Sequence, residues 1–182
     1  MRKIALIVGH GAAKQGASND NGVTEYLFND ELAHMIAPIL IQRGFEPLIV
    51  YRTGSYRELP KQVNDTGADV AVSLHCNAFN KKASGSEVLH YMNSSKSEKL
   101  ARCININVLD ALELPDRGLR PVNVKQKGKA GDRGGYLCFK TAMPCVIVEP
   151  FFIDNDSDLA RATECKFALA QAIARGVIEY AG

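Results

Sequence analysis

Hydrophobic residues in this chain follow two patterns that alternate from the N-terminus to the C-terminus. Short unbroken runs are typical of strands buried on both faces, whereas a spacing of three or four residues is typical of helices with one buried side. The runs and shorter apolar segments predict strands at 4–10, 45–51, 69–75, 86–92, 136–140 and 144–149. The helical spacing predicts helices at 25–43, 56–66, 94–114 and 156–180, with a kink or a break at Pro38 and a loop at 117–135.

This alternation of strands and helices predicts an α/β fold. We expect a single domain with a mainly parallel, twisted sheet of about six strands, flanked by helices on both faces. A chain of 182 residues is long enough to form one domain with a full hydrophobic core. We find no internal repeat, linker or low-complexity tract, so we expect residues 1–182 to form one catalytic domain.

Composition excludes several classes of protein. The formal charge of +2 is too small to indicate nucleic-acid binding, and no run approaches the ~18 apolar residues of a membrane helix. We therefore expect neither a nucleic-acid partner nor membrane insertion. The N-terminus enters a strand at once, so no signal peptide is visible. The five cysteines form no C-x-x-C pair, and we interpret most of them as small core residues of a protein folded in a reducing compartment.

Three of the buried strands end in ionisable residues, namely His10, His75 and Glu149. If these strands are parallel neighbours, their carboxyl ends meet at one rim of the sheet, where ligands bind in open α/β folds. Glu25 begins the first helix after a glycine-containing loop and can fold back to the same rim. Two imidazoles and a carboxylate with an open fourth position form a catalytic zinc site, and the second carboxylate is then available as a base.

Each of these residues also has a structural interpretation. A single strand-end histidine is more often a hydrogen-bonded structural residue, and Glu25 is also a first-turn glutamate favoured by the helix dipole. Two such histidines together with a strand-end glutamate favour the metal interpretation. His34 and His90 lie within a predicted helix and a predicted strand, so we interpret both as structural or surface residues.

Two nucleotide-binding motifs almost fit the first loop. Lys14 stands where a dinucleotide fingerprint needs its third glycine, and Ala17 replaces the lysine of a P-loop. A Cys76–His75 nucleophile pair is also disfavoured, because adjacent strand residues point to opposite faces. These motifs therefore give no support to a nucleotide-binding or thiol-based function.

With these residues identified, the chain resembles the zinc-dependent N-acetylmuramoyl-L-alanine amidases of type 3, which include phage endolysins and bacterial cell-wall hydrolases. Gly9-His10-Gly11 is similar to the glycine-rich loop that opens the family. Residues 73–78, Ser-Leu-His-Cys-Asn-Ala, are very similar to the family's Ser-Ile-His-Ala-Asn-Ala, and residues 144–149 resemble its final strand with its catalytic glutamate. The motifs occur in the family's order over nearly the whole chain.

The resemblance implies that His10, Glu25 and His75 bind one Zn²⁺ ion and that Glu149 is the catalytic carboxylate. It also implies cleavage of the amide bond between N-acetylmuramic acid and the L-alanine of the stem peptide in peptidoglycan. Without a visible signal peptide, we expect a phage endolysin that is made in the cytoplasm and acts on the cell wall or periplasm after release. The oligomeric state stays open, with a monomer favoured.

Two other functions stay open at this point. A zinc carboxypeptidase or endopeptidase acting on stem peptides would use the same metal chemistry, and a non-enzymatic wall-binding module would be expected to lack a ligand or the catalytic carboxylate. The basic segment 117–133 is expected either to border the substrate cleft or to be a solvated loop. Its cations are Arg117, Arg120, Lys125, Lys127, Lys129 and Arg133.

Overall fold

The computed structural model describes residues 1–124 and 134–182 and confirms the predicted α/β fold of one domain. The strands are β1 (Lys3–Val8), β2 (Glu46–Tyr51), β3 (Val70–Leu74), β4 (Ser86–Tyr91), β5 (Asp116–Val122) and β6 (Cys145–Glu149). The helices are α1 (Glu25–Gln42), α2 (Leu59–Asp65), α3 (Ser95–Leu112), α4 (Gly135–Lys140), α5 (Asp156–Glu164) and α6 (Lys166–Ala181).

The six strands form one sheet in the order β2-β1-β3-β6-β4-β5. Neighbouring strands are parallel except β4 and β6, which are antiparallel. Val8 pairs with Leu74, and Leu74 pairs with Val148. Strands β1 and β3, which lead into His10 and His75, and strand β6, which ends in Glu149, are therefore consecutive neighbours that end at the same edge of the sheet, as predicted.

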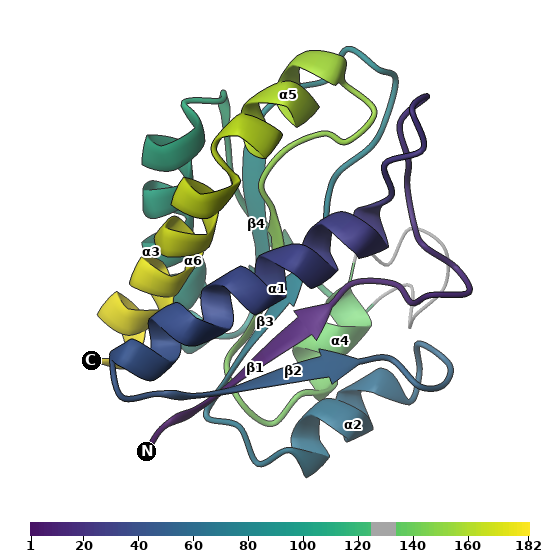
Figure 1. Cartoon of the computed structure of the whole chain (residues 1–182). Helices are drawn as coiled ribbons and strands as arrows, with labels where there is room; N and C mark the ends of the chain where they lie inside the picture. The colour runs from purple at the N-terminus through teal and green to yellow at the C-terminus, as the bar shows by residue number, and fades with distance from the viewer. Residues whose placement is uncertain (125–133) are drawn as a thin grey trace.

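Helices cover both faces of the sheet (Figure 1). The larger core lies between the sheet and the layer of α1, α3 and α6, and includes Leu32, Ile104 and Ile173. A smaller core on the opposite face contains Val63 of α2 and Leu137 of α4. Both termini lie at the end of the molecule away from the arrowheads of β1, β2 and β3, so neither terminus lies beside the strand ends that carry the candidate site (Figure 1).

The structure corrects three predicted elements. Residues 136–140 form helix α4 rather than a strand, because Leu137 and Cys138 pack on the smaller core and a short apolar run fits either element. Strand β5 occupies the first part of the predicted loop 117–135, where pairing with β4 outweighs a polar sequence. The predicted helix 156–180 is two helices that meet at Cys165. Residues 125–133 lie outside the described part of the chain.

Helix α1 continues through Pro38 as one element, so the predicted break does not occur.

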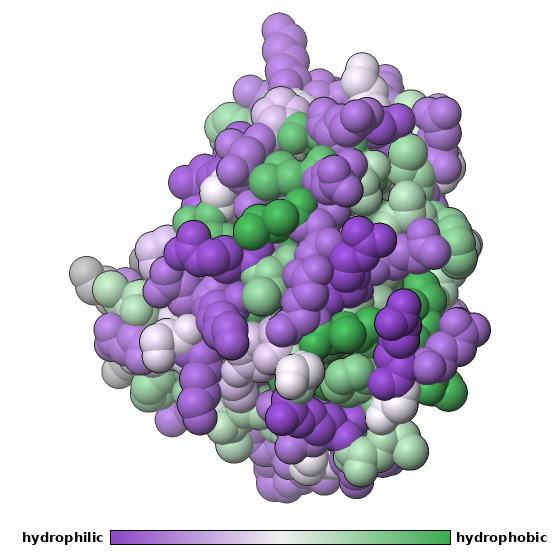
Figure 2. Space-filling model, turned by 90° about the vertical axis from the view of Figure 1, so that its left-hand side faces the viewer, coloured by the Kyte–Doolittle hydropathy of each residue, from purple (hydrophilic) through white to green (hydrophobic). Residues whose placement is uncertain are grey.

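Figure 2 shows the side of the molecule on which α3 and α6 lie, and the hydrophobic side chains in view form small groups separated by hydrophilic ones. Within the described residues, no helix is both long and apolar enough to cross a membrane.

Replacing Gly176 with alanine is expected to destabilise the fold. Gly176 lies in α6 against the backbone of α3, and an added Cβ would lie 2.5 Å from the Cα of Ile104. Alanine favours a helix by about 1 kcal/mol over glycine, but forced separation of two packed helices costs about 1 to 3 kcal/mol. Chemical denaturation should therefore show a lower free energy of unfolding. Gln171→Ala, on the exposed side of the same helix, is the control and should leave this free energy nearly unchanged.

Candidate metal centre

His10 lies two residues after the end of β1, in a turn with an uncommon backbone conformation. Its φ of 65° lies in the left-handed region, which is uncommon for residues other than glycine and is often found at functional sites. A Cβ on Gly9 would lie 2.7 Å from the ring of His75, and a Cβ on Gly16 would lie 2.5 Å from Oε2 of Glu25. Because Gly9 and Gly16 have no side chains, they leave room for the side chains of His10, Glu25 and His75.

Glu25 is positioned by the start of helix α1. The side chain of Thr24 caps this helix by accepting a hydrogen bond from the N–H of Leu27. The Glu25 side chain points away from the helix and accepts backbone hydrogen bonds from Ala17, at 3.1 Å to Oε2, and from Cys76, at 3.0 Å to Oε1. With 3% of its surface exposed, Glu25 is a buried carboxylate fixed by the loop before α1 and the loop after β3.

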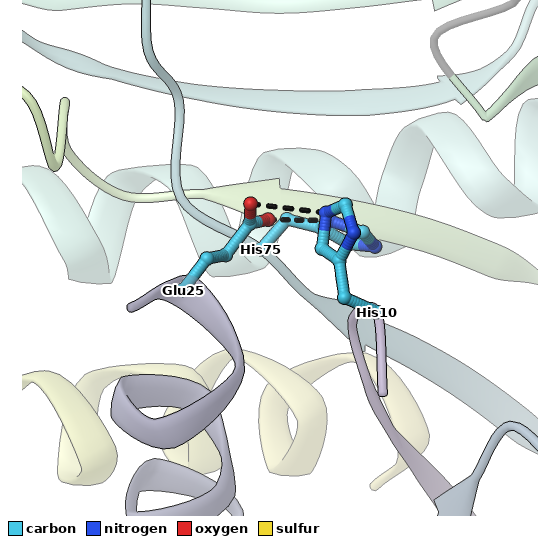
Figure 3. Close-up of side chains that lie close together, drawn as sticks. All are labelled: His10, Glu25 and His75. Carbon is cyan, nitrogen blue, oxygen red and sulfur yellow. Dashed lines mark hydrogen bonds and ion pairs between the residues drawn. The ribbon is translucent and has the colours of Figure 1, made fainter. Parts of the chain in front are cut away.

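The structure brings His10, Glu25 and His75 together (Figure 3). Oε2 of Glu25 lies 3.0 Å from Nε2 of His10, and Oε1 lies 2.7 Å from Nδ1 of His75. The two imidazole rings meet edge to face, with their centroids 5.2 Å apart. One nitrogen from each histidine and one carboxylate oxygen all lie within 4.8 Å of one another. Three residues from distant parts of the sequence thus present their donor atoms to one small space.

The carboxylate of Glu25 and the two imidazoles influence one another's protonation. Burial alone would raise the pKa of Glu25, but the hydrogen bonds and positive charge of His10 and His75 outweigh it and hold this pKa far below its usual range. Burial would likewise lower the pKa of His75, yet the hydrogen bond and charge of Glu25, together with the charge of Glu149, raise it. Glu25 is therefore ionised at neutral pH, which a cation ligand requires.

Glu149 ends strand β6, next to the strand that leads into His75. The backbone N–H of His75 donates a hydrogen bond of 3.0 Å to the carbonyl oxygen of Val148. The influence of the Glu149 charge on the pKa of His75 indicates that the carboxylate lies near the cluster. Glu149 is therefore at the predicted rim, on the neighbouring strand, and outside the group of three donor residues.

The donor set fits zinc. Zinc binds imidazole nitrogen and carboxylate oxygen at roughly 2.0–2.2 Å, and catalytic sites use three protein ligands that leave one position open. Ligands around such a tetrahedral ion lie about 3.4 Å apart, which agrees with three donors that lie within 4.8 Å of one another. Among the described residues, this is the one group of three or more His, Cys, Asp or Glu side chains arranged in this way.

The other histidines and the nearest thiol lie outside this cluster. His34 is bound to Asp30 on the surface of α1, and His90 lies within β4, where its Nδ1 is 3.2 Å from the carbonyl oxygen of Tyr91. Burial, with the charges of Glu25 and Glu149, raises the pKa of Cys76 well above its usual value. Cys76 is therefore a neutral thiol, consistent with the interpretation of the cysteines as core residues.

Comparison with known proteins gives the family. A family model described as N-acetylmuramoyl-L-alanine amidase matches residues 4–179. The chain belongs to this amidase family. The amidase LytC of Bacillus subtilis is 27% identical over 180 residues, which cover 94% of this chain and 34% of LytC. The endolysin of Bacillus phage SPP1 is 28% identical over 181 residues, which cover 96% of this chain and 64% of the endolysin. The chain thus spans about a third of the length of LytC.

Solved structures of amidase catalytic domains share this fold. The catalytic domain of CwlV from Bacillus (Paenibacillus) polymyxa var. colistinus has a TM-score of 0.83 and 26% identity, covering 100% of this chain and 98% of that one. The catalytic domain of the CD27L endolysin, which targets Clostridia difficile, has a TM-score of 0.80 and 28% identity, covering 98% of both chains. The resemblance to type 3 amidases inferred from the motifs is therefore confirmed at the level of family and fold.

Sequence patterns did not reveal one buried group beside this cluster. Glu87 of β4 is buried and accepts hydrogen bonds from Asn77, Arg117 and Arg120. Both arginines fall within the loop predicted from the sequence, and no spacing rule connects them to a strand about 30 residues earlier. The only sequence signal was the position of Asn77, two residues after a predicted ligand.

Proposed function

We propose that this chain is a zinc-dependent peptidoglycan hydrolase that cleaves the amide bond between N-acetylmuramic acid and the L-alanine of the stem peptide. The observation that carries this proposal is the convergence of His10, Glu25 and His75 on one small space, with Glu149 on the neighbouring strand. Membership of the amidase family supports the choice of bond.

In this proposal His10, Glu25 and His75 hold one Zn²⁺ ion. When bound, this ion would supply Lewis acidity, which would make water a nucleophile near neutral pH and polarise the scissile carbonyl. Glu149 acts as the general base that accepts the proton of the attacking water and then delivers it to the leaving amine. The buried contacts of Glu25 with the N–H groups of Ala17 and Cys76 keep its carboxylate aimed at the two imidazoles.

We propose that residues 1–182 contain the catalytic domain and that it acts on the bacterial cell wall, as an endolysin does. A wall-binding module without activity is disfavoured because all four chemical groups are present. A carboxypeptidase or endopeptidase would use the same four groups, so the reaction products decide between these enzymes. Free lactyl ends on the sugars with intact released peptides indicate an amidase, whereas shortened peptides indicate a peptidase.

Removal of the metal is expected to abolish hydrolysis reversibly. Dialysis against a chelator should reduce the release of stem peptides from purified peptidoglycan to background, and one equivalent of Zn²⁺ should restore it. Because zinc binds the folded chain, saturating zinc at 100 times its dissociation constant should also raise the free energy of unfolding by about 2.7 kcal/mol. Full hydrolysis by protein shown to be metal-free by elemental analysis would contradict the proposal.

A further inference from the structure

Glu87 is a buried carboxylate with an unusual number of cationic partners. Its side chain is 1% exposed, and its Oε2 accepts hydrogen bonds from Nε of Arg117, at 3.1 Å, and from Nε of Arg120, at 3.0 Å. Its Oε1 accepts a hydrogen bond of 2.8 Å from Nδ2 of Asn77. A buried carboxylate needs compensating partners, and here two guanidinium groups converge on a single oxygen. We call Glu87, Arg117 and Arg120 the arginine cluster.

The arginine cluster adjoins the candidate metal centre from the side of β4 and β5. Glu87 is the register partner of Glu149 in the antiparallel pair β4–β6. Side chains directly opposite in such a pair lie on the same face, with their Cβ atoms about 5 Å apart. Asn77 connects the cluster to the segment that carries His75. A substrate reacting beside Glu149 would therefore pass within reach of Arg117 and Arg120.

Both guanidinium groups are fixed by Glu87, and both remain partly exposed to solvent. Among the described residues, each arginine donates to Glu87 through Nε, and the ring of the buried Phe152 lies 4.9 Å from the guanidinium carbon of Arg117. The side chains of Arg117 and Arg120 are still 34% and 42% exposed. A guanidinium that is fixed through Nε still has its two terminal nitrogens available. These two nitrogens can donate two parallel hydrogen bonds to a carboxylate. Because the fork is already oriented, little side-chain entropy is lost on binding.

We propose that Arg117 and Arg120, oriented by Glu87, form a subsite that binds the first free carboxylate of the stem peptide beyond the scissile amide. The inference builds on the proposed function and adds a determinant of specificity to it. The sugar side of the scissile bond is neutral, because the lactyl carboxylate is part of the amide, whereas the peptide side carries free carboxylates. Arg117 and Arg120 stand on β5, two strands from Glu149, but their guanidinium groups reach back to Glu87 on β4, about 5 Å from β6. An extended peptide advances about 3.5 Å per residue, so the second stem residue comes within reach of these guanidinium groups.

The test measures binding and hydrolysis separately. The two probes are N-acetylmuramoyl-L-alanyl-D-glutamate with its γ-carboxylate blocked as the methylamide, and the same compound with the α-carboxylate also converted to the amide. Titration calorimetry with the zinc-loaded Glu149→Gln chain, which keeps the subsite but hydrolyses the probes slowly, should show that the carboxylate form binds about ten- to a hundredfold more tightly. Adding Arg120→Gln to this chain should weaken binding of the carboxylate form by a similar factor and leave the amidated form unchanged. Equal affinity of the Glu149→Gln chain for the two compounds would overturn the proposal.

Two further variants separate recognition from a purely structural role. Arg120→Lys keeps a positive charge beside Glu87 but lacks the fork, so it should fold like the wild type and still lose most of the preference for the carboxylate form. Arg102→Gln, which removes an exposed arginine of α3, is the matched control and should keep the full preference. If Arg120→Lys and Arg120→Gln both keep the wild-type preference, the arginine cluster only anchors β5 and the subsite is rejected.

The same experiment keeps this inference distinct from the proposed function. A wild-type chain that prefers the carboxylate form but hydrolyses neither compound would uphold the subsite and refute the amidase assignment. A chain that hydrolyses both compounds with equal KM and binds them equally would uphold the amidase assignment and refute the subsite. With the subsite in place, Arg120→Gln should raise KM for the carboxylate form and leave kcat nearly unchanged, because the interaction is made equally in the ground state and the transition state.

Discussion

Replacing Glu149 with glutamine is expected to lower kcat for muropeptide hydrolysis by about 10²- to 10⁴-fold, the usual contribution of a general base. Glutamine has nearly the same shape but cannot accept the proton of the attacking water. Glu149 lies outside the three donor residues, so the variant should still bind one equivalent of zinc. The measurement combines elemental analysis of the purified variant with the rate of release of stem peptides.

The control for Glu149→Gln is Glu98→Gln, which makes the same chemical change in an exposed residue of α3 that pairs with Arg102. This variant should retain wild-type kcat. A Glu149→Gln variant with full zinc content and full activity would remove Glu149 from the mechanism and leave the metal centre untouched. Loss of both zinc and activity would instead show that Glu149 supports the metal, contrary to the role proposed for it.

Replacing Glu25 with glutamine is expected to lower zinc affinity more than about 100-fold, beyond the effect typical of residues that only support a ligand. The substitution removes the one anionic donor of the cluster, and the single side-chain oxygen of glutamine can accept only one of the two hydrogen bonds that Ala17 and Cys76 donate to different oxygens of Glu25. Hydrolysis at limiting zinc should fall to background. Competition with a chromophoric chelator measures the affinity directly.

Glu31→Gln provides a matched control on the same helix. Glu31 is exposed on α1 and pairs with Lys166, so this variant should bind zinc and hydrolyse peptidoglycan like the wild type. The thermal shift produced by added zinc should likewise persist in Glu31→Gln and disappear in Glu25→Gln. Unchanged zinc affinity in Glu25→Gln would show that the ion is held elsewhere, and the assignment of His10, Glu25 and His75 as ligands would then be wrong.

Much of the fold could be predicted because its strongest signals are local. The largely apolar segments predicted as strands at 4–10, 69–75 and 144–149 contain the central strands β1, β3 and β6, which are almost entirely buried. Predictions were wrong where local sequence is ambiguous. The segment 135–140 is too short to separate helix from strand, and β5 is an edge strand whose polar residues pair with β4. In both cases the partner that decides the element lies far away in the sequence.

For the candidate site, too, some features could be predicted from the sequence and others could not. The positions of His10 and His75 at the ends of buried strands, and of Glu25 at the start of a helix, were visible in the chain. Their distances were not, because these depend on the strand order β1-β3-β6 and on the turn around His10. The arginine cluster shows the opposite case, since nothing in the spacing of Glu87, Arg117 and Arg120 indicates that they meet.

The sequence by itself determined which residues could do chemistry and which elements carry them, because hydrophobic periodicity and strand-end positions are properties of neighbouring residues. Tertiary structure alone decided that Glu25 bridges the two imidazoles and that Glu87 lies opposite Glu149. These contacts arise from sheet pairing between distant segments, and pairing is selected by the burial of whole strands and helices rather than by any local pattern.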